Sequence, residues 1–200
     1  MPPSGLSPDR PIDTVFLDRD GVINQRIPGD YIKRWDEFVF LPGVVEALRN
    51  LRRAGIRSVV ITNQRGIARG LYTAADLHLV HQRMQAHLDA HDARVDAIYY
   101  CPDLDGPRRK PAPGMLFDAQ RDHPAIDFAR AVLIGDSASD LQAAAGAGCR
   151  GILVGSGEHL AEQLEALRTL GLSPSHVARD LPDALRSWAP LARSLESLSR

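Results

Sequence analysis

Four aspartates fall in two short groups that could carry metal-assisted chemistry. Asp18 and Asp20 are two residues apart, and Asp136 and Asp140 are four residues apart. Carboxylates this close repel one another unless a cation lies between them. Mg²⁺ is the natural cation here, because it prefers carboxylate oxygen and keeps several waters. The two groups together predict a magnesium site, although each one alone could be a polar loop or a helix cap.

A second set of residues could hold a phosphate group. Thr62, Asn63 and Gln64 follow an apolar run and offer a hydroxyl, amides and backbone N–H groups. Lys110 is one of only two lysines among 24 basic residues, and it follows Arg109 in a Pro-rich loop. Positive charge opposite carboxylates would bind a phosphate dianion and screen its repulsion of an attacking carboxylate. We therefore predict a phosphate site, with a solvated basic loop as the alternative for this segment.

The apolar pattern along the chain predicts the elements that must position these residues. Short apolar runs indicate strands, and apolar residues at helical spacing indicate helices between them. The expected strands cover 14–17, 58–61, 97–100, 131–134 and 151–154, with a short one near 177, and the expected helices cover about 42–55, 73–88, 113–123, 137–147, 158–170 and 181–195. Such alternation forms parallel βαβ units with both sheet faces covered. The predicted fold class is α/β, a doubly wound parallel sheet.

The candidate residues follow the predicted strands, where a parallel sheet places its ligands. In such sheets ligands bind beyond the carboxyl ends of the strands. Two acids, a cation, a hydroxyl and a lysine at that edge indicate phosphoryl transfer through an aspartyl-phosphate. A carboxylate can attack phosphorus once a cation and a lysine neutralise the phosphate charge.

These residues resemble the four motifs of the haloacid dehalogenase-like phosphatases. The matching motifs, in order over residues 15–154, are Asp18-x-Asp20-Gly21, Thr62-Asn63, Lys110 and Gly135-Asp136-x3-Asp140. Longer segments, Phe16–Asn24, Thr62–Gly70 and Arg109–Leu116, are similar to the D,D-heptose 1,7-bisphosphate phosphatases and to the related histidinol-phosphatases. The resemblance implies a Rossmann-like haloacid dehalogenase fold and a Mg²⁺-dependent phosphatase with a small phosphorylated sugar as substrate. A histidinol-phosphatase or another small phosphomonoester phosphatase is the alternative within the family.

The resemblance also implies roles for individual residues. Asp18 would be the nucleophile, and Asp20 would protonate the leaving alcohol and then activate water. Thr62 and Lys110 would clamp the phosphoryl group. The Mg²⁺ ligands would be Asp18, the main-chain carbonyl of Asp20 and Asp136, with Asp140 behind them. The expected substrate contacts are Asp30, Tyr31, Thr62, Asn63, Gln64, Arg65, Arg109 and Lys110.

One loop departs from the resemblance. The heptose bisphosphate phosphatases usually carry a zinc loop of Cys-x-His and Cys-x-Cys just before the Arg-Lys-Pro motif. This chain keeps only Cys101, and Asp103, Gly106 and Arg108 stand where the other ligands would be. A structural tetrahedral zinc site therefore lacks its ligands, and we expect no structural zinc.

The stretches between the motifs leave no room for a separate cap domain, because each is just long enough for one helix and one strand. We expect a single phosphatase domain over residues 1–200, with residues 1–11 as a flexible tail. A site without a lid must grip its substrate with short loops. Within residues 25–35, Asp30 and Tyr31 are therefore the candidates for sugar contacts.

Composition fits a protein that handles a small molecule in water. The 24 basic and 25 acidic residues give a net charge of −1, which predicts neither a nucleic-acid partner nor a membrane surface. No apolar run approaches the ~20 residues of a membrane span. Cys101 and Cys149 cannot build a disulfide framework, so we expect a cytoplasmic location. The oligomeric state stays open, with a monomer among the options.

Functions of other classes remain as alternatives. The chain could be a receiver-like signalling module phosphorylated on Asp18, or a non-catalytic phosphate-binding module on the same scaffold. Asp20 counts against both, because neither needs an acid to protonate a leaving alcohol. The histidines at 78, 81, 87 and 91 are not expected to bind a metal, since they lack a metalloprotease pattern.

Overall fold

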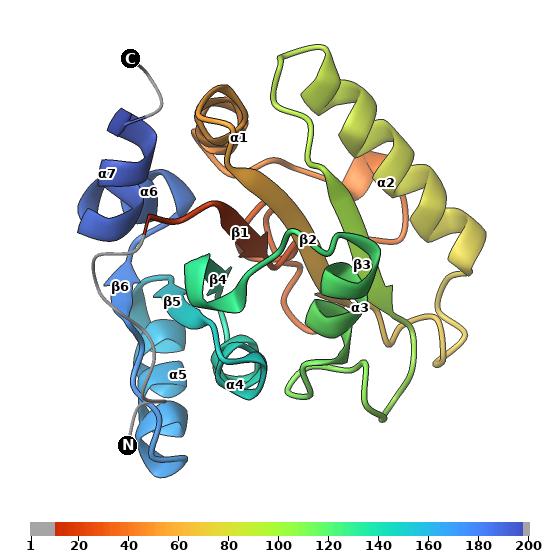
Figure 1. The fold of residues 1–200 in the computed structure, drawn as a ribbon. Coiled ribbons are helices and arrows are strands. Elements are labelled where there is room, and N and C mark those ends of the chain that lie inside the picture. The colour runs from red at the N-terminus through yellow and green to blue at the C-terminus, as the bar shows by residue number, and fades with distance from the viewer. Residues whose placement is uncertain (1–10, 198–200) are drawn as a thin grey trace.

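The strands of this protein form one six-stranded sheet in the computed structural model, which describes residues 11–197 (Figure 1). All neighbouring strands are parallel, and their order is β3-β2-β1-β4-β5-β6. The strands are β1 Thr14–Leu17, β2 Arg57–Asn63, β3 Ala97–Cys101, β4 Ala131–Gly135, β5 Arg150–Val154 and β6 His176–Ala178. The chain order reverses between β1 and β4, where a doubly wound sheet opens its ligand crevice. The predicted fold class is confirmed.

Helices cover both faces of the sheet. They are α1 Val44–Arg53, α2 Ala74–Asp89, α3 Gly114–Asp122, α4 Ala138–Ala147, α5 Gly157–Thr169, α6 Leu181–Ser187 and α7 Ala189–Ser197, with short 3-10 helices η1 Trp35–Glu37 and η2 Phe128–Arg130. Helices α1, α2, α6 and α7 lie on one face, and α3, α4 and α5 lie on the other (Figure 1). Strand β1 shows why both faces are apolar. Val15 and Leu17 pack into one core and Phe16 into the other.

Local sequence signals account for the helix ends nearest the site. Thr73 caps α2, where its side chain accepts from the Asp76 backbone and the Asp76 carboxylate accepts from Thr73 in return. Helix α4 begins in the same way with Ser137 and Asp140. It ends at Gly148, whose φ of 78° is readily adopted only by glycine.

The last predicted helix, over 181–195, is wrong as a single element. It divides into α6 and α7 at Trp188, whose backbone is extended (φ −88°, ψ 104°). A continuous helix would need an N–H from Pro190, which proline lacks. The break lets the Trp188 ring lie 5.1 Å from the guanidinium of Arg150, so a tertiary contact accompanies the local interruption.

The connection between β1 and α1 is a loop over residues 18–43 that contains only η1, in place of a cap domain. Isolated strand-like bridges join Asn24 to Asp20 and to Phe40, which fold the loop back on itself. Apart from Pro11, the predicted tail over residues 1–11 lies outside the described residues. Within residues 11–197 no helix has both the length and the apolar character that crossing a bilayer requires.

Candidate active site

The first and fourth strands bring three carboxylates together. Asp18 follows β1, Asp136 follows the adjacent β4, and Asp140 lies in the first turn of α4. Each offers a carboxylate oxygen within 4.8 Å of the others. Lys110, from the loop between β3 and α3, lies among them, with its Nζ 2.9 Å from Asp18 and 2.6 Å from Asp140. The two aspartate groups seen in the sequence therefore meet in one cluster.

Asp140 supports this cluster from behind. One of its oxygens accepts from Lys110, and the other accepts from the backbone N–H and hydroxyl of Ser137. With both oxygens engaged and its side chain fully buried, Asp140 leaves Asp18 and Asp136 to face the pocket. The role expected from the sequence for Asp140, behind the Mg²⁺ ligands, stays a prediction.

The loops after β1 and β4 approach so closely that one position between them must be glycine. Gly21 has a φ of 95°, and a Cβ there would collide with the Asp136 carboxylate. Because Gly21 has no side chain, the Asp136 carboxylate can lie directly beside the loop that carries Asp18.

The electrostatics of the cluster fit a bound divalent cation. Burial raises the pKa of Asp18 to about 7, with Asp140 and Asp136 adding to the rise and Lys110 opposing it. Burial also raises the pKa of Asp136, again together with Asp140. Burial and mutual repulsion disfavour the ionised forms of these two carboxylates, and a bound cation would relieve both effects. Paired carboxylates of this kind suit Mg²⁺. Asp18 and Asp136 could therefore hold this ion.

Asp20 lies outside the carboxylate cluster and is held by three neighbours. Arg19 contacts both of its oxygens at 2.9 Å, Asn24 donates to one at 2.9 Å, and Gln64 donates to the other at 3.0 Å. Burial alone would raise the pKa of Asp20, but Arg19 and these hydrogen bonds outweigh it and lower the pKa. Asp20 nevertheless lines the pocket, so it can meet a bound molecule.

The three polar residues at the end of β2 have different surroundings. Thr62 and Asn63 line the pocket, and the Asn63 side chain also bonds the backbone N–H and carbonyl of Lys110 at 3.1 and 2.9 Å. Asn63 thus fixes the loop that carries the lysine. Gln64 differs from the prediction: it is fully buried, does not line the pocket and donates to Asp20 and Thr62 from behind.

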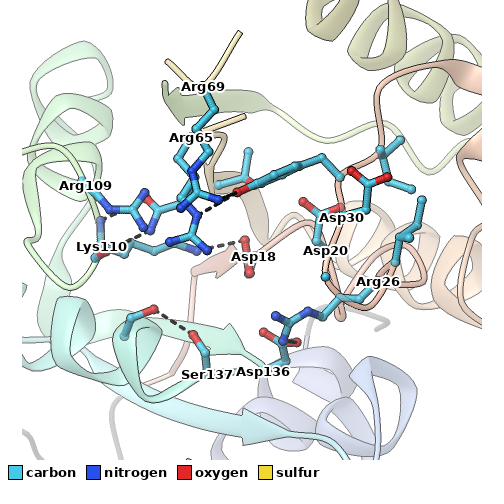
Figure 2. Close-up of a pocket in the computed structure, with 17 residues that line it drawn as sticks. Asp18, Asp20, Arg26, Asp30, Arg65, Arg69, Arg109, Lys110, Asp136 and Ser137 are labelled. Atoms are coloured by element: carbon cyan, nitrogen blue, oxygen red, sulfur yellow. Dashed lines mark hydrogen bonds and ion pairs between the residues drawn. The ribbon is translucent and has the colours of Figure 1, made fainter. Parts of the chain in front are cut away.

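Arginines form the wall of the pocket that lies beside Lys110 (Figure 2). Arg65, Arg69 and Arg109 line it, and Arg65 and Arg69 both donate to the Tyr31 hydroxyl, at 2.7 and 3.4 Å. Asp30 also lines the pocket and pairs with Lys33 at 2.6 Å. The cavity has a volume of about 370 Å³, enough for a small sugar phosphate.

Several lining residues escaped the sequence analysis. Arg26 lies 3.0 Å from the Asp136 carboxylate and 3.2 Å from the His159 ring, and Arg69, Ser137 and Ser139 also line the pocket. Serines and arginines in loops carry no spacing signal. For Arg26 the only clue was its place within residues 25–35, the segment expected to supply the sugar contacts.

The segment that corresponds to the zinc loop of the resembled family, residues 101–108, contains no cluster of metal ligands among the described residues. Cys101 is buried, with its sulfur 3.8 Å from Asp103, and among the described residues the aspartate cluster at Asp18 is the one group that could hold a metal. Arg108 pairs instead with Asp118 of α3 at 2.7 Å. The absence of zinc stays a prediction.

Comparisons with known proteins point to one family. A HAD-hydrolase-like family model matches residues 107–184. A Thermosynechococcus vestitus protein named D-glycero-D-manno-heptose-1,7-bisphosphate 7-phosphatase is 40% identical over 191 residues, covering 88% of this chain and 94% of that protein. An Escherichia coli K12 protein named D-glycero-beta-D-manno-heptose-1,7-bisphosphate 7-phosphatase is 37% identical, covering 88% of this chain and 94% of the relative.

A solved structure is similar over almost its whole length. The D,D-heptose 1,7-bisphosphate phosphatase from B. bronchiseptica, crystallised with magnesium and phosphate, superposes with a TM-score of 0.79 at 38% identity. The match covers 91% of this chain and 99% of that structure.

Proposed function

Because the chain belongs to the D,D-heptose 1,7-bisphosphate phosphatase family of haloacid dehalogenase-like hydrolases, we propose that it is a Mg²⁺-dependent phosphatase removing the 7-phosphate of D-glycero-D-manno-heptose 1,7-bisphosphate. One observation carries this proposal. The Asp18 carboxylate lies between Lys110 and Asp136 in a pocket whose other wall consists of arginines. That arrangement suits a substrate with one phosphate at the carboxylates and a second anion at the arginines.

The first half of the reaction transfers the phosphoryl group to Asp18. An Asp18 oxygen attacks phosphorus, the bond from phosphorus to the sugar oxygen breaks, and Asp20 gives its proton to that oxygen. A phosphate dianion beside Asp20 raises the proton affinity of its carboxylate, which supplies the protonated form. Lys110 and Thr62 hold the phosphoryl oxygens.

The second half returns the enzyme to its starting state. Asp20, now ionised, takes a proton from water as the water oxygen attacks phosphorus, and the bond between Asp18 and phosphorus breaks. Phosphate leaves, Asp18 is again a free carboxylate, and Asp20 again carries the proton for the next turnover. Asp18, the main-chain carbonyl of Asp20 and Asp136 would hold Mg²⁺, and the ion would supply positive charge against the phosphoryl group and the nucleophile.

We infer that Arg109 binds the second anion of the substrate, the phosphate at C1. In its support, Arg109 lines the pocket beside Arg65 and Arg69, while its neighbour Arg108 turns away to pair with Asp118. We infer that Asp30 and Tyr31 contact the sugar; in support, both line the pocket, and the Tyr31 hydroxyl accepts from Arg65 and Arg69. A cytoplasmic location fits the free, buried thiols of Cys101 and Cys149.

The proposed function is tested by phosphate release from heptose 1,7-bisphosphate, heptose 7-phosphate and histidinol phosphate. We expect the bisphosphate to be preferred and heptose 1-phosphate to be its product. Arg109→Ala should lose ~10²-fold in kcat/KM on the bisphosphate, because a charge-assisted contact worth roughly 3 kcal/mol disappears. The same change should matter much less for heptose 7-phosphate.

Arg108→Ala is the matched control, since it removes an adjacent arginine that does not line the pocket. Equal losses for Arg109→Ala on both substrates would show that Arg109 serves the transferred phosphoryl group. Preference for histidinol phosphate in the unmodified enzyme would replace the proposed substrate.

A further inference from the structure

Gln64 lies fully buried between two groups of the proposed reaction. Its Nε2 donates to the Asp20 carboxylate at 3.0 Å and to the Thr62 hydroxyl oxygen at 2.8 Å. An ionised carboxylate can only accept, so the amide nitrogen must face Asp20 and the amide oxygen must face the other way. One orientation of the Gln64 amide therefore serves both contacts.

Tyr72 fixes that orientation. Its hydroxyl donates to Gln64 Oε1 at 2.6 Å, and its side chain is buried where the chain turns back after β2. Burial raises the pKa of Tyr72, so the hydroxyl stays a donor at physiological pH. Gly66 makes room for this ring, because a Cβ there would collide with it.

We propose that Tyr72 and Gln64 are positioning residues for acid–base catalysis, through hydrogen bonds that aim the Asp20 carboxylate. The inference rests on the proposed phosphatase function and assigns two residues that never touch the substrate. Asp20 is held from one side by Arg19 and Asn24, and Gln64 holds it from the side of β2.

Thr62 gains a defined role from the same contact. Since Gln64 donates to the Thr62 oxygen, the Thr62 hydroxyl proton is free to point into the pocket, which Thr62 lines. The buried Gln64 amide thus orients two groups: the Asp20 carboxylate, which carries the proton, and the Thr62 hydroxyl, which binds the phosphoryl group.

Losing the Tyr72 hydroxyl would leave a buried carbonyl oxygen of Gln64 without this donor. The Gln64 amide would then lose the contact that anchors its oxygen side, and its nitrogen would be aimed less firmly at Asp20 and Thr62. Asp20 would move from the position in which it meets the leaving oxygen. A reaction whose leaving group needs no proton would be spared this loss.

The experiment compares first-turnover rates of leaving-group release in Tyr72→Phe and the unmodified enzyme, with Mg²⁺ present. For heptose 1,7-bisphosphate, rapid quenching should show a fall of about tenfold at saturating substrate, with little change in KM. For p-nitrophenyl phosphate, whose nitrophenolate leaves as a stable anion, the burst rate should fall less than about twofold. Equal losses on both substrates, or no loss on either, would overturn the proposal.

Tyr99→Phe is the matched control, because it removes a tyrosine hydroxyl that bonds Asp122 and does not line the pocket. It should leave both rates unchanged. A double-mutant cycle with Gln64→Met tests the route of the effect. If Tyr72 acts through Gln64, Tyr72→Phe should cost nothing further in that background, and an undiminished cost would contradict this route.

Gln64→Met alone also keeps the test decisive if Tyr72→Phe does not fold, since it should show the same dependence on the leaving group. Failure of the proposed substrate is a separate result, because it appears in the unmodified enzyme before any variant is compared. The comparison would then use a sugar phosphate that the enzyme does hydrolyse.

Discussion

The buried negative charge of Asp18, the proposed nucleophile, is only partly neutralised by its neighbours. Lys110 is its closest positive partner at 2.9 Å, but Lys110 also serves Asp140 at 2.6 Å. Burial alone would lower the pKa of Lys110, yet the two carboxylates raise it, so the lysine remains charged. The remaining negative charge in the cluster would attract a metal ion, and that ion would offset the repulsion between the carboxylates and a bound phosphate group.

Changing Asp18 to asparagine should separate catalysis from folding. The amide keeps the shape of the side chain but cannot attack phosphorus, so we expect phosphate release to fall by at least ~10⁴-fold. The metal-free variant should unfold at the same temperature as the unmodified protein or higher, because a carboxylate with a raised pKa has been removed. Steady-state kinetics and thermal unfolding measure the two effects, and near-normal turnover would refute the role of Asp18.

At the scale of elements, helix α2 supports the loop after β1. Its buried His81 contacts the guanidinium of Arg19 at 3.1 Å, and Arg19 in turn holds Asp20. Burial, with the positive charge of Arg19, lowers the pKa of His81 to about 3. A neutral His81 can accept from Arg19, whereas a protonated one would set two positive charges against each other. The helix therefore makes the site sensitive to acid.

His81→Gln should reduce that sensitivity. In the folded protein the pKa of His81 is about 3, below its unfolded value of about 6.5, so its stability contribution is complete above pH 6.5 and declines as the pH falls toward 3. The loss between pH 6.5 and 5 should reach about 2 kcal/mol at most. Urea unfolding at pH 7 and pH 5 should show a smaller difference for His81→Gln than for the unmodified protein.

His78→Gln, on the exposed side of the same helix, is the control and should keep the full pH dependence. If His81→Gln lost as much stability between the two pH values as the unmodified protein does, another group would carry the effect.

At the scale of the whole molecule, a chain with a net charge of −1 separates its charges across one pocket. Carboxylates from β1 and β4 lie on one side, and arginines from the loops after β2 and β3 lie on the other (Figure 2). The sheet order puts the central strands β1 and β4 beside each other and β2 and β3 on one flank. The topology therefore gives the pocket its two oppositely charged walls.

Metal removal tests the molecule as a whole. A chelator should abolish turnover without unfolding the protein, and Mg²⁺ should restore it. At a hundredfold excess over Kd, Mg²⁺ should add about 2.7 kcal/mol of stability, or roughly 5 to 10 °C in Tm. Asp136→Asn should lose most of this shift. Elemental analysis should find no stoichiometric zinc, and one zinc per chain that resists chelation would show that Cys101 has unforeseen partners.

The sequence by itself determined the order of the elements and the main candidate residues. Apolar periodicity is local, so the strands before Asp18 and Asp136 could be recognised from a few residues each. The rule that parallel strands carry ligands at their carboxyl ends then predicted that these aspartates meet Thr62 and Lys110. The structure brings all four residues to one pocket.

Only the tertiary structure decided the orientation of the side chains that lie beyond the strand ends. Gln64 points inward to Tyr72 instead of toward a substrate, Arg26 reaches Asp136, and His81 of α2 lies against Arg19, 62 residues away in sequence. Arg26 and His81 contact segments that are distant in the chain, and Gln64 also contacts Asp20, 44 residues away. Local periodicity carries no information about such contacts, because a side chain is aimed by the neighbours that folding brings to it.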